Sequence, residues 1–285
     1  MQKGISGAEV LARCFASQGI KFVFTVPTPR LTPLINALKN ENGVRIITSH
    51  NETAATLMAE GYVRRSRLQA AVLTDAKGRA ISQICGVTNA WADKVPLLSL
   101  SLCEDEEPDC NKSVERWRYD QRSVFQTITS WNIRLTSLVK APEQIAKCLQ
   151  ESCHNKMGPA HIDIPFRLLD EIIREDDLMD MPKPVRQRPV SPVRLRGDSV
   201  SVAQAAKLLM NAQKPLIFCG GGVKVSEACV AMTDFLEEYE IPISTSMAGI
   251  GSLPISHPLC LGGPSYTAGE VFHVAIKEAD VVLAL

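Results

Sequence analysis

The stretch that decides the fold is VRIITSHNETAATLMAEGYVRRSRLQAAVLT, residues 44–74. It begins with a β-branched run at 44–49, continues with apolar residues at three-to-four spacing over 52–65, and ends with the apolar run 70–74. Runs that are apolar on both faces and separated by a helical pattern are typical of a parallel sheet covered by helices. The stretch therefore predicts a strand–helix–strand unit.

The same alternation continues along most of the chain. Strands are predicted where a short β-branched or apolar run is bounded by turn residues, at 21–26, 44–49, 70–74, 96–101, 160–164, 215–219, 241–246 and 281–285. Helices are predicted where apolar residues recur with helical spacing, at 8–18, 31–38, 52–65, 80–92, 143–153, 201–211, 226–239 and 269–278. The fold class is therefore α/β, with parallel sheets flanked by helices.

A charged, proline-rich stretch interrupts this pattern between residues 174 and 196. Such a composition is typical of an extended linker between domains. We predict a first domain at 1–172, a linker at 173–197 and a second domain at 198–285. Only three strands are predicted in the second domain, whereas doubly wound sheets typically have about five or six. We therefore expect an incomplete Rossmann-like domain and a chain that is part of a longer protein.

Composition argues against several functional classes. The chain has 31 Lys and Arg against 31 Asp and Glu, so no net positive charge attracts nucleic acid or an anionic membrane. No run approaches the roughly 18 apolar residues of a membrane-spanning helix. The nine cysteines are scattered without a Cys-x-x-Cys pair. This usage predicts free thiols in a cytoplasmic protein and no metal site.

Glu52 is the candidate functional residue that the pattern alone brings forward. It lies between a predicted strand and the N-terminus of a predicted helix, where the helix dipole favours a carboxylate. Two interpretations stay open, a plain N-terminal helix acid and a functional carboxylate. Ala55 and Ala59 share one face of the same helix and permit close packing against another element.

Glycines at 220–222 follow a predicted strand and offer backbone amides to an anion. A dinucleotide fingerprint would need glycine three residues after Gly222, and Val225 occupies that position. We therefore interpret the three glycines as a tight strand-to-helix turn. His161 and His257 belong to no hydrolase or metalloprotease motif, and we interpret them as structural.

Five segments, taken in order, carry a recognisable pattern. In the first domain, Glu52 is followed by alanines and then by Ala59, Gly61-Tyr62 and Arg64. The other segments lie at 24–33, 88–97 and 158–165, and in the second domain at 214–223 with 241–242 and 257–262. Together they resemble thiamine-diphosphate-dependent enzymes of the acetolactate synthase and 2-oxoacid decarboxylase type. The resemblance covers nearly the whole chain.

The resemblance implies a cofactor site. In that family the glutamate aligned with Glu52 hydrogen-bonds a ring nitrogen of the aminopyrimidine, so Glu52 would be the catalytic residue that activates thiamine diphosphate. Val26, Pro27, Thr74 and Gly78 would also contact the cofactor. The first domain would have the thiamine-diphosphate-binding fold and bind the pyrimidine ring, and the second would be the central domain. A third domain, absent here, would hold Mg²⁺ and the diphosphate; FAD is possible in the family but unsupported by this sequence.

The resemblance also implies a function. The chain would be the N-terminal portion of an acetolactate synthase-like carboligase or decarboxylase that acts on a 2-oxo acid, works as a homodimer or homotetramer, and is inactive as this portion alone. Three departures from the family pattern keep alternatives open. The turn has Thr25, Thr28 and Pro29 where glycines are usual, residues 75–77 read Asp-Ala-Lys, and Trp117 replaces a glutamine. They point to an unusual 2-oxo acid, to a non-catalytic paralogue, or to a nucleotide-binding module.

Overall fold

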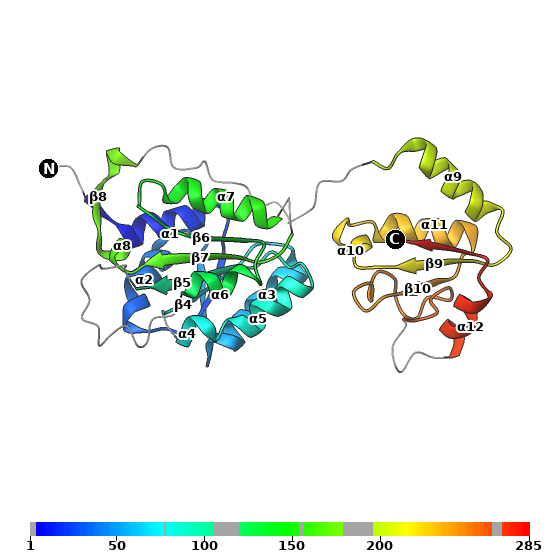
Figure 1. Cartoon of the computed structure of the whole chain (residues 1–285), viewed down its shortest axis with the longest axis horizontal. Helices are drawn as coiled ribbons and strands as arrows, with labels where there is room; N and C mark the ends of the chain where they lie inside the picture. Colours follow the sequence, from blue (N-terminus) through cyan, green and yellow to red (C-terminus); the bar gives the residue numbers. More distant parts are fainter. Residues whose placement is uncertain (1–3, 77, 105–119, 154–156, 179–195, 264–269) are drawn as a thin grey trace. The chain divides into compact units, whose positions relative to one another are not determined.

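The computed structural model describes residues 4–76, 78–104, 120–153, 157–178, 196–263 and 270–285. The chain divides into two compact units, which we call unit 1 (Met1–Ser191) and unit 2 (Pro192–Leu285) (Figure 1). Most of the predicted linker lies outside the described residues. The predicted domain bounds of 1–172, 173–197 and 198–285 therefore stay a prediction.

Unit 1 is built around a six-stranded sheet in which every neighbouring pair is parallel. The strand order is β3-β2-β4-β5-β7-β6. The strands are β2 (Phe22–Thr25), β3 (Arg45–Thr48), β4 (Ala71–Thr74), β5 (Leu98–Cys103), β6 (Trp131–Arg134) and β7 (Ala160–Pro165). The predicted α/β class with parallel sheets is confirmed.

Helices cover both faces of this sheet (Figure 1). One face packs on α1 (Gly7–Ser17), α2 (Thr32–Asn40), α7 (Ala141–Cys153) and α8 (Arg167–Asp170) through the largest apolar core of the unit. The opposite face carries α3 (Glu52–Ser66), α4 (Gly78–Ile81), α5 (Ile84–Ala92) and α6 (Gln121–Gln126), with two smaller apolar clusters. The face under α3 to α6 therefore has room for polar side chains.

Local sequence signals set the starts of the main helices. At α1, the Ser6 hydroxyl accepts from the Glu9 amide while the Glu9 carboxylate accepts from the Ser6 amide at 2.9 Å, which is a capping box. At α3, Asn51 Oδ1 accepts from the Ala54 amide at 2.7 Å. Helix α3 ends at Ser66 and is followed by the C-cap residue Arg67, which has φ 57°, in the left-handed region.

Short elements of unit 1 were not predicted. A two-stranded antiparallel ribbon joins β1 (Gly4–Ser6) to β8 (Ile172–Arg174), and α6 and β6 lie between residues 121 and 134. A short 3₁₀ turn, η1 (Pro29–Leu31), precedes α2, and another, η3 (Glu175–Asp177), follows β8. The single helix predicted at 80–92 is wrong, because α4 and α5 are separate. The Thr53 hydroxyl of α3 donates to the Ser82 carbonyl at 2.7 Å, and this contact marks the point of interruption.

Unit 2 has a three-stranded parallel sheet in the order β10-β9-β11. Its strands are β9 (Pro215–Cys219), β10 (Ile243–Thr245) and β11 (Val281–Ala284), and its helices are α9 (Ser199–Met210), α10 (Gly222–Val225), α11 (Cys229–Tyr239) and α12 (Glu270–Glu278). Leu216, Ile217 and Cys219 of β9 are buried. The glycines at 220–222 connect β9 to α10, as the interpretation of a tight turn requires.

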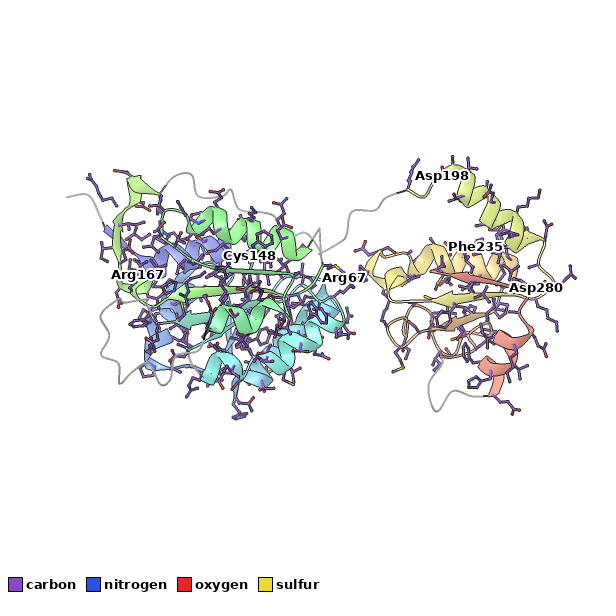
Figure 2. The ribbon with its side chains drawn as sticks, in the orientation of Figure 1. Arg67, Cys148, Arg167, Asp198, Phe235 and Asp280 are labelled. Atoms are coloured by element: carbon purple, nitrogen blue, oxygen red, sulfur yellow. The ribbon has the colours of Figure 1, made fainter. Side chains whose placement is uncertain are left out.

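The cysteines in the described part of the chain are free thiols. Cys148 of α7 is enclosed by unit 1 (Figure 2), and burial raises the pKa values of the Cys14 and Cys153 thiols to about 12. These thiols are therefore inert at neutral pH. Among the described residues, no helix has the length and apolar character needed to span a bilayer.

Two helical glycines test the packing of α3 on α5. Gly86→Ala should destabilise unit 1 by about 1–3 kcal/mol. The added Cβ would lie 2.6 Å from Thr56 Cγ2 and 2.8 Å from Thr56 Cβ, which are in a buried side chain. The matched variant is Gly61→Ala, because no atom lies within 4 Å of the added Cβ. This exposed helical substitution should stabilise by roughly 0.5–1 kcal/mol. Thermal unfolding followed by circular dichroism measures both, and a Gly86→Ala protein as stable as wild type would contradict this packing.

Candidate functional site

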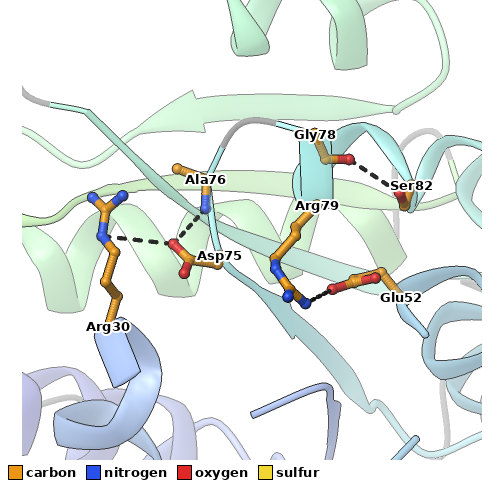
Figure 3. Close-up of a pocket in the computed structure, with 7 residues that line it drawn as sticks. All are labelled: Arg30, Glu52, Asp75, Ala76, Gly78, Arg79 and Ser82. Atoms are coloured by element: carbon orange, nitrogen blue, oxygen red, sulfur yellow. Dashed lines mark hydrogen bonds and ion pairs between the residues drawn. The ribbon is translucent and has the colours of Figure 1, made fainter. Parts of the chain in front are cut away.

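An open pocket of about 530 Å³ lies beside residues that follow the carboxyl ends of β2, β3 and β4 (Figure 3). These strands are neighbours in the sheet, so the segments that leave them meet at one edge. Ligands of parallel α/β sheets bind at this edge. The pocket is lined by Arg30, Glu52, Asp75, Ala76, Gly78, Arg79 and Ser82.

The Glu52 carboxylate lies in this pocket at the first position of α3. Its side chain is only 10% exposed, and the Asn51 cap fixes the start of the helix beside it. The Thr56 hydroxyl donates to the Glu52 carbonyl at 2.7 Å. The positive end of the helix dipole stabilises a negative charge at this position. Among the described residues, Oε1 pairs with Arg79, and the other oxygen, Oε2, has no partner.

Arg79 supplies the positive charge next to Glu52. Its Nη1 lies 2.5 Å from Glu52 Oε1, while its side chain remains 50% exposed (Figure 3). Helix α4 holds Arg79 in place, since the Ser82 hydroxyl donates to the Gly78 carbonyl at 3.0 Å. The contact between Thr53 and the Ser82 carbonyl ties the far end of α4 to the start of α3. The two charges therefore come from the starts of α3 and α4, and the Thr53 contact joins these two helices.

Asp75 forms the opposite side of the pocket. Its carboxylate accepts from the Ala76 amide and from the Thr28 hydroxyl, each at 2.8 Å. Arg30 Nε lies 3.7 Å from the same carboxylate. Thr28 and Asp75 are both departures from the family pattern, and the structure brings them into contact. The Thr28 hydroxyl thus satisfies part of the hydrogen-bonding capacity of the Asp75 carboxylate.

Arg30 is held by groups outside the pocket as well. Its Nη1 and Nη2 donate to the two carboxylate oxygens of Glu104 at 2.9 and 3.3 Å. Its guanidinium also stacks 4.6 Å from the centre of the Phe166 ring. Arg30 is thus preorganised by an anion and a ring, whereas Arg79 has Glu52 as its partner among the described residues.

A hydrogen-bonded chain of side chains crosses the sheet from β4 to β7 on the face that carries α3 to α6. We call it the buried polar chain; its members are Thr74, Gln83, Ser99, Ser101, Gln121, His161 and Asp163, all of them buried. Gln83 is central, because its Oε1 accepts from Ser99 Oγ at 2.7 Å and its Nε2 donates to Ser101 Oγ at 2.9 Å. Nε2 also contacts the Thr74 hydroxyl, next to the pocket residue Asp75.

His161 continues the buried polar chain toward β7. Its Nδ1 lies 2.8 Å from Ser99 Oγ, and its ring stacks on Phe125 with centroids 3.8 Å apart. Because Ser99 donates to Gln83, its oxygen accepts from Nδ1–H. Nε2 then lies 2.9 Å from Asp163 Oδ1, which also accepts from Gln121. Asp163 thus joins His161 to Gln121 at the β7 end of the buried polar chain.

Comparisons with known proteins identify the family. Residues 5–123 match the model described as thiamine pyrophosphate enzyme, N-terminal TPP binding domain, and residues 202–285 match thiamine pyrophosphate enzyme, central domain. The chain belongs to the thiamine pyrophosphate enzyme family. The first match contains all residues of the pocket.

This thiamine pyrophosphate enzyme chain is similar to acetolactate synthase large subunits. It is 28% identical to a probable acetolactate synthase large subunit of Methanocaldococcus jannaschii over 99% of this chain and 47% of that protein. It is 25% identical to the acetolactate synthase large subunit of Lactococcus lactis, over 100% of this chain and 48% of the relative. A mitochondrial acetolactate synthase of Schizosaccharomyces pombe is also 25% identical, over 99% and 42%. The chain spans about half the length of these curated relatives.

The structure brings only some of the predicted site residues together. Glu52 and Gly78 line the pocket. Thr74 is buried at the end of β4, where it belongs to the buried polar chain. Val26 and Pro27 follow β2 but are not among the residues that line the pocket. The predicted roles of all five residues in binding the cofactor stay predictions.

Several residues of the site were missed or lie outside the structure. Arg30, Arg79 and Ser82 were not predicted to belong to the pocket. The sequence did indicate that Arg79 lies near the site, because it follows the same strand as the predicted residue Gly78. Its contact with Glu52 depends on the order of the strands in the sheet. Two of the noted departures, Lys77 and Trp117, lie outside the described residues. Within the described part of the chain, no three His, Cys, Asp or Glu side chains gather where they could hold a metal ion.

Ser99→Ala tests the buried polar chain. The substitution removes the donor to Gln83 Oε1 and the acceptor for His161 Nδ1, both buried, and should cost about 1–3 kcal/mol per unsatisfied group. Ser17→Ala is the matched variant, because the Ser17 hydroxyl makes only a local bond to the Cys14 carbonyl. It should change stability by about 0.5 kcal/mol or less. Urea unfolding compares the two variants. Equal midpoints of unfolding would show that the buried polar chain contributes no stability.

Proposed function

We propose that this chain provides the pyrimidine-binding and central parts of a thiamine-diphosphate-dependent carboligase or decarboxylase of the acetolactate synthase type, acting on 2-oxo acids. The observation that carries the proposal is the Glu52 carboxylate, buried at the start of α3 with Oε2 directed to no protein partner in the described part of the chain. The names of the relatives support catalysis over a non-catalytic paralogue.

The residues of the pocket fit the aminopyrimidine ring of that cofactor. A carboxylate oxygen in a sheltered position can make a strong hydrogen bond to a ring nitrogen. Ala76 and Gly78 are small, and an added Cβ on Gly78 would meet no atom within 4 Å, so this wall leaves room for a flat ring. In this proposal Glu52 orients the ring and holds a proton at its nitrogen. When bound, thiamine diphosphate supplies the electron sink for cleavage of the bond next to the carbonyl.

Other parts of the proposal concern groups beyond the pocket. We propose that Mg²⁺ and the diphosphate are bound by a domain other than the two matched here. Among the described residues, no three His, Cys, Asp or Glu side chains gather to hold a metal ion. The matched domain descriptions name thiamine pyrophosphate and do not name FAD. The free thiols support a reducing compartment such as the cytoplasm.

Substitution of Glu52 tests the catalytic role. In the protein that contains the diphosphate-binding domain, Glu52→Gln should abolish turnover of 2-oxo acids, because an amide cannot replace the charged hydrogen bond. The matched variant is Glu60→Gln, which alters a second buried α3 carboxylate that pairs with Arg64 outside the pocket. Glu60→Gln should lower stability and preserve turnover. A Glu52→Gln enzyme within about tenfold of wild-type kcat, roughly 1.4 kcal/mol of barrier, would refute the assignment.

We further propose that the surface of α3 forms a two-fold interface in a homodimer or homotetramer. Leu57 and Met58 on this helix are 40% and 43% exposed, and Trp91 on α5, which packs against α3, is 50% exposed. Leu57→Glu should convert the oligomer to monomers, because a charge would be buried between two copies. Ile172→Glu, on an exposed residue of β8, should leave assembly unchanged. Light scattering measures the masses; a monomeric, active wild-type protein would contradict the proposal.

A further inference from the structure

Arg79 and the proposed cofactor ring require the same group. The inference rests on the proposed function, in which a ring nitrogen binds the Glu52 carboxylate. Arg79 Nη1 already lies 2.5 Å from Glu52 Oε1. The Arg79 guanidinium lies beside the Glu52 carboxylate, within the pocket that we propose for the ring (Figure 3). We propose that Arg79 is a competing counter-ion of Glu52, which the aminopyrimidine must displace from the carboxylate when it binds.

The burial of the two partners supports displacement of Arg79. The Glu52 side chain is 10% exposed and fixed at the start of a long helix, whereas Arg79 is 50% exposed on a helix of four residues. Glu52 cannot leave the pocket without disturbing α3. Arg79 can turn outward by rotation of its own side chain and regain water around the guanidinium. The arginine is therefore the partner that moves.

Charge also favours competition over sharing of the carboxylate. A ring that takes a proton at its nitrogen becomes a cation, and a guanidinium on the other oxygen of the same carboxylate would repel it. The remaining charges of the pocket do not remove this conflict. Asp75, on the opposite side, is already occupied by Thr28, the Ala76 amide and Arg30. Arg79 thus compensates the negative charge of Glu52 until a ring takes the place of the guanidinium.

The size of the effect follows from the exposure of Arg79. Ion pairs with an exposed partner contribute about 0.2–1 kcal/mol, which converts to at most about a fivefold change in affinity. Arg79→Ala should therefore bind the ring more tightly than wild type, by up to about fivefold. Arg79→Lys retains a positive charge in the pocket and should remain close to wild type.

The experiment uses the 285-residue chain and a neutral probe, 4-amino-5-hydroxymethyl-2-methylpyrimidine, titrated by ligand-observed NMR. Because the probe is neutral, tighter binding by Arg79→Ala cannot be explained by attraction of a cationic ligand to a pocket that has lost a positive charge. Arg30→Ala removes an equal charge from the same pocket without touching Glu52, and it should not tighten binding. Arg13→Ala breaks a surface ion pair with Glu175 of the same 2.5 Å length and should have no effect. Circular dichroism verifies the fold of each variant.

Two results complete the test. Glu52→Gln and the double variant Glu52→Gln/Arg79→Ala should bind equally weakly, because the gain from removing Arg79 depends on the carboxylate. The inference is overturned if Arg79→Ala binds the probe no more tightly than wild type. It is also overturned if removal of Arg79 tightens binding in the absence of the Glu52 carboxylate. Either result leaves the proposed function intact. If neither wild type nor Arg79→Ala binds the probe, the proposed ring site itself fails, and the inference fails with it.

Discussion

A carboxylate buried at the start of a helix needs both a fixed backbone and a compensating charge, and the surroundings of Glu52 meet these needs. Asn51 fixes the backbone by capping α3, and the helix dipole favours the charge. Arg79 then supplies a cation from α4. Helix α4 follows β4, which β2 separates from β3, the strand before Glu52. The contact of the Thr53 hydroxyl with the Ser82 carbonyl joins α4 to the start of α3, and so places the two charges side by side.

The two faces of the unit 1 sheet differ because of strand register. Leu98, Leu100 and Leu102 of β5 belong to the large apolar core, as do Ala160, Ile162 and Ile164 of β7. The alternate residues, such as Ser99 opposite His161, point to the face that carries α3 to α6. A one-residue shift in register would place these polar groups in the apolar core, where they would have no partners. The buried polar chain therefore specifies the alignment of β4, β5 and β7 as well as contributing hydrogen bonds.

The elements that sequence predicted best are those with strong local signals. The runs at 70–74 and 160–164 became β4 and β7, because strands buried on both faces of a parallel sheet are nearly continuously apolar. Edge strand β6 was missed, since its four residues mix Trp131 and Ile133 with polar neighbours. Strands β1 and β8 have three residues each and depend on pairing across most of unit 1. The position of Glu52 was predicted from its place before a helix, whereas its contact with Arg79 depends on strand order, which local patterns do not contain.

The construction of α4 separates the chemistry of the pocket wall from the stability of the sheet. Contacts at its end, from Thr53 to the Ser82 carbonyl and from Gln83 into the buried polar chain, hold the segment in place. Residues 78 and 79 are exposed and contribute little to the apolar cores. Mutations at these positions can alter the charge facing the ligand while the fold stays unchanged. This segment is thus a place where related sequences can diverge in ligand preference at small cost in stability.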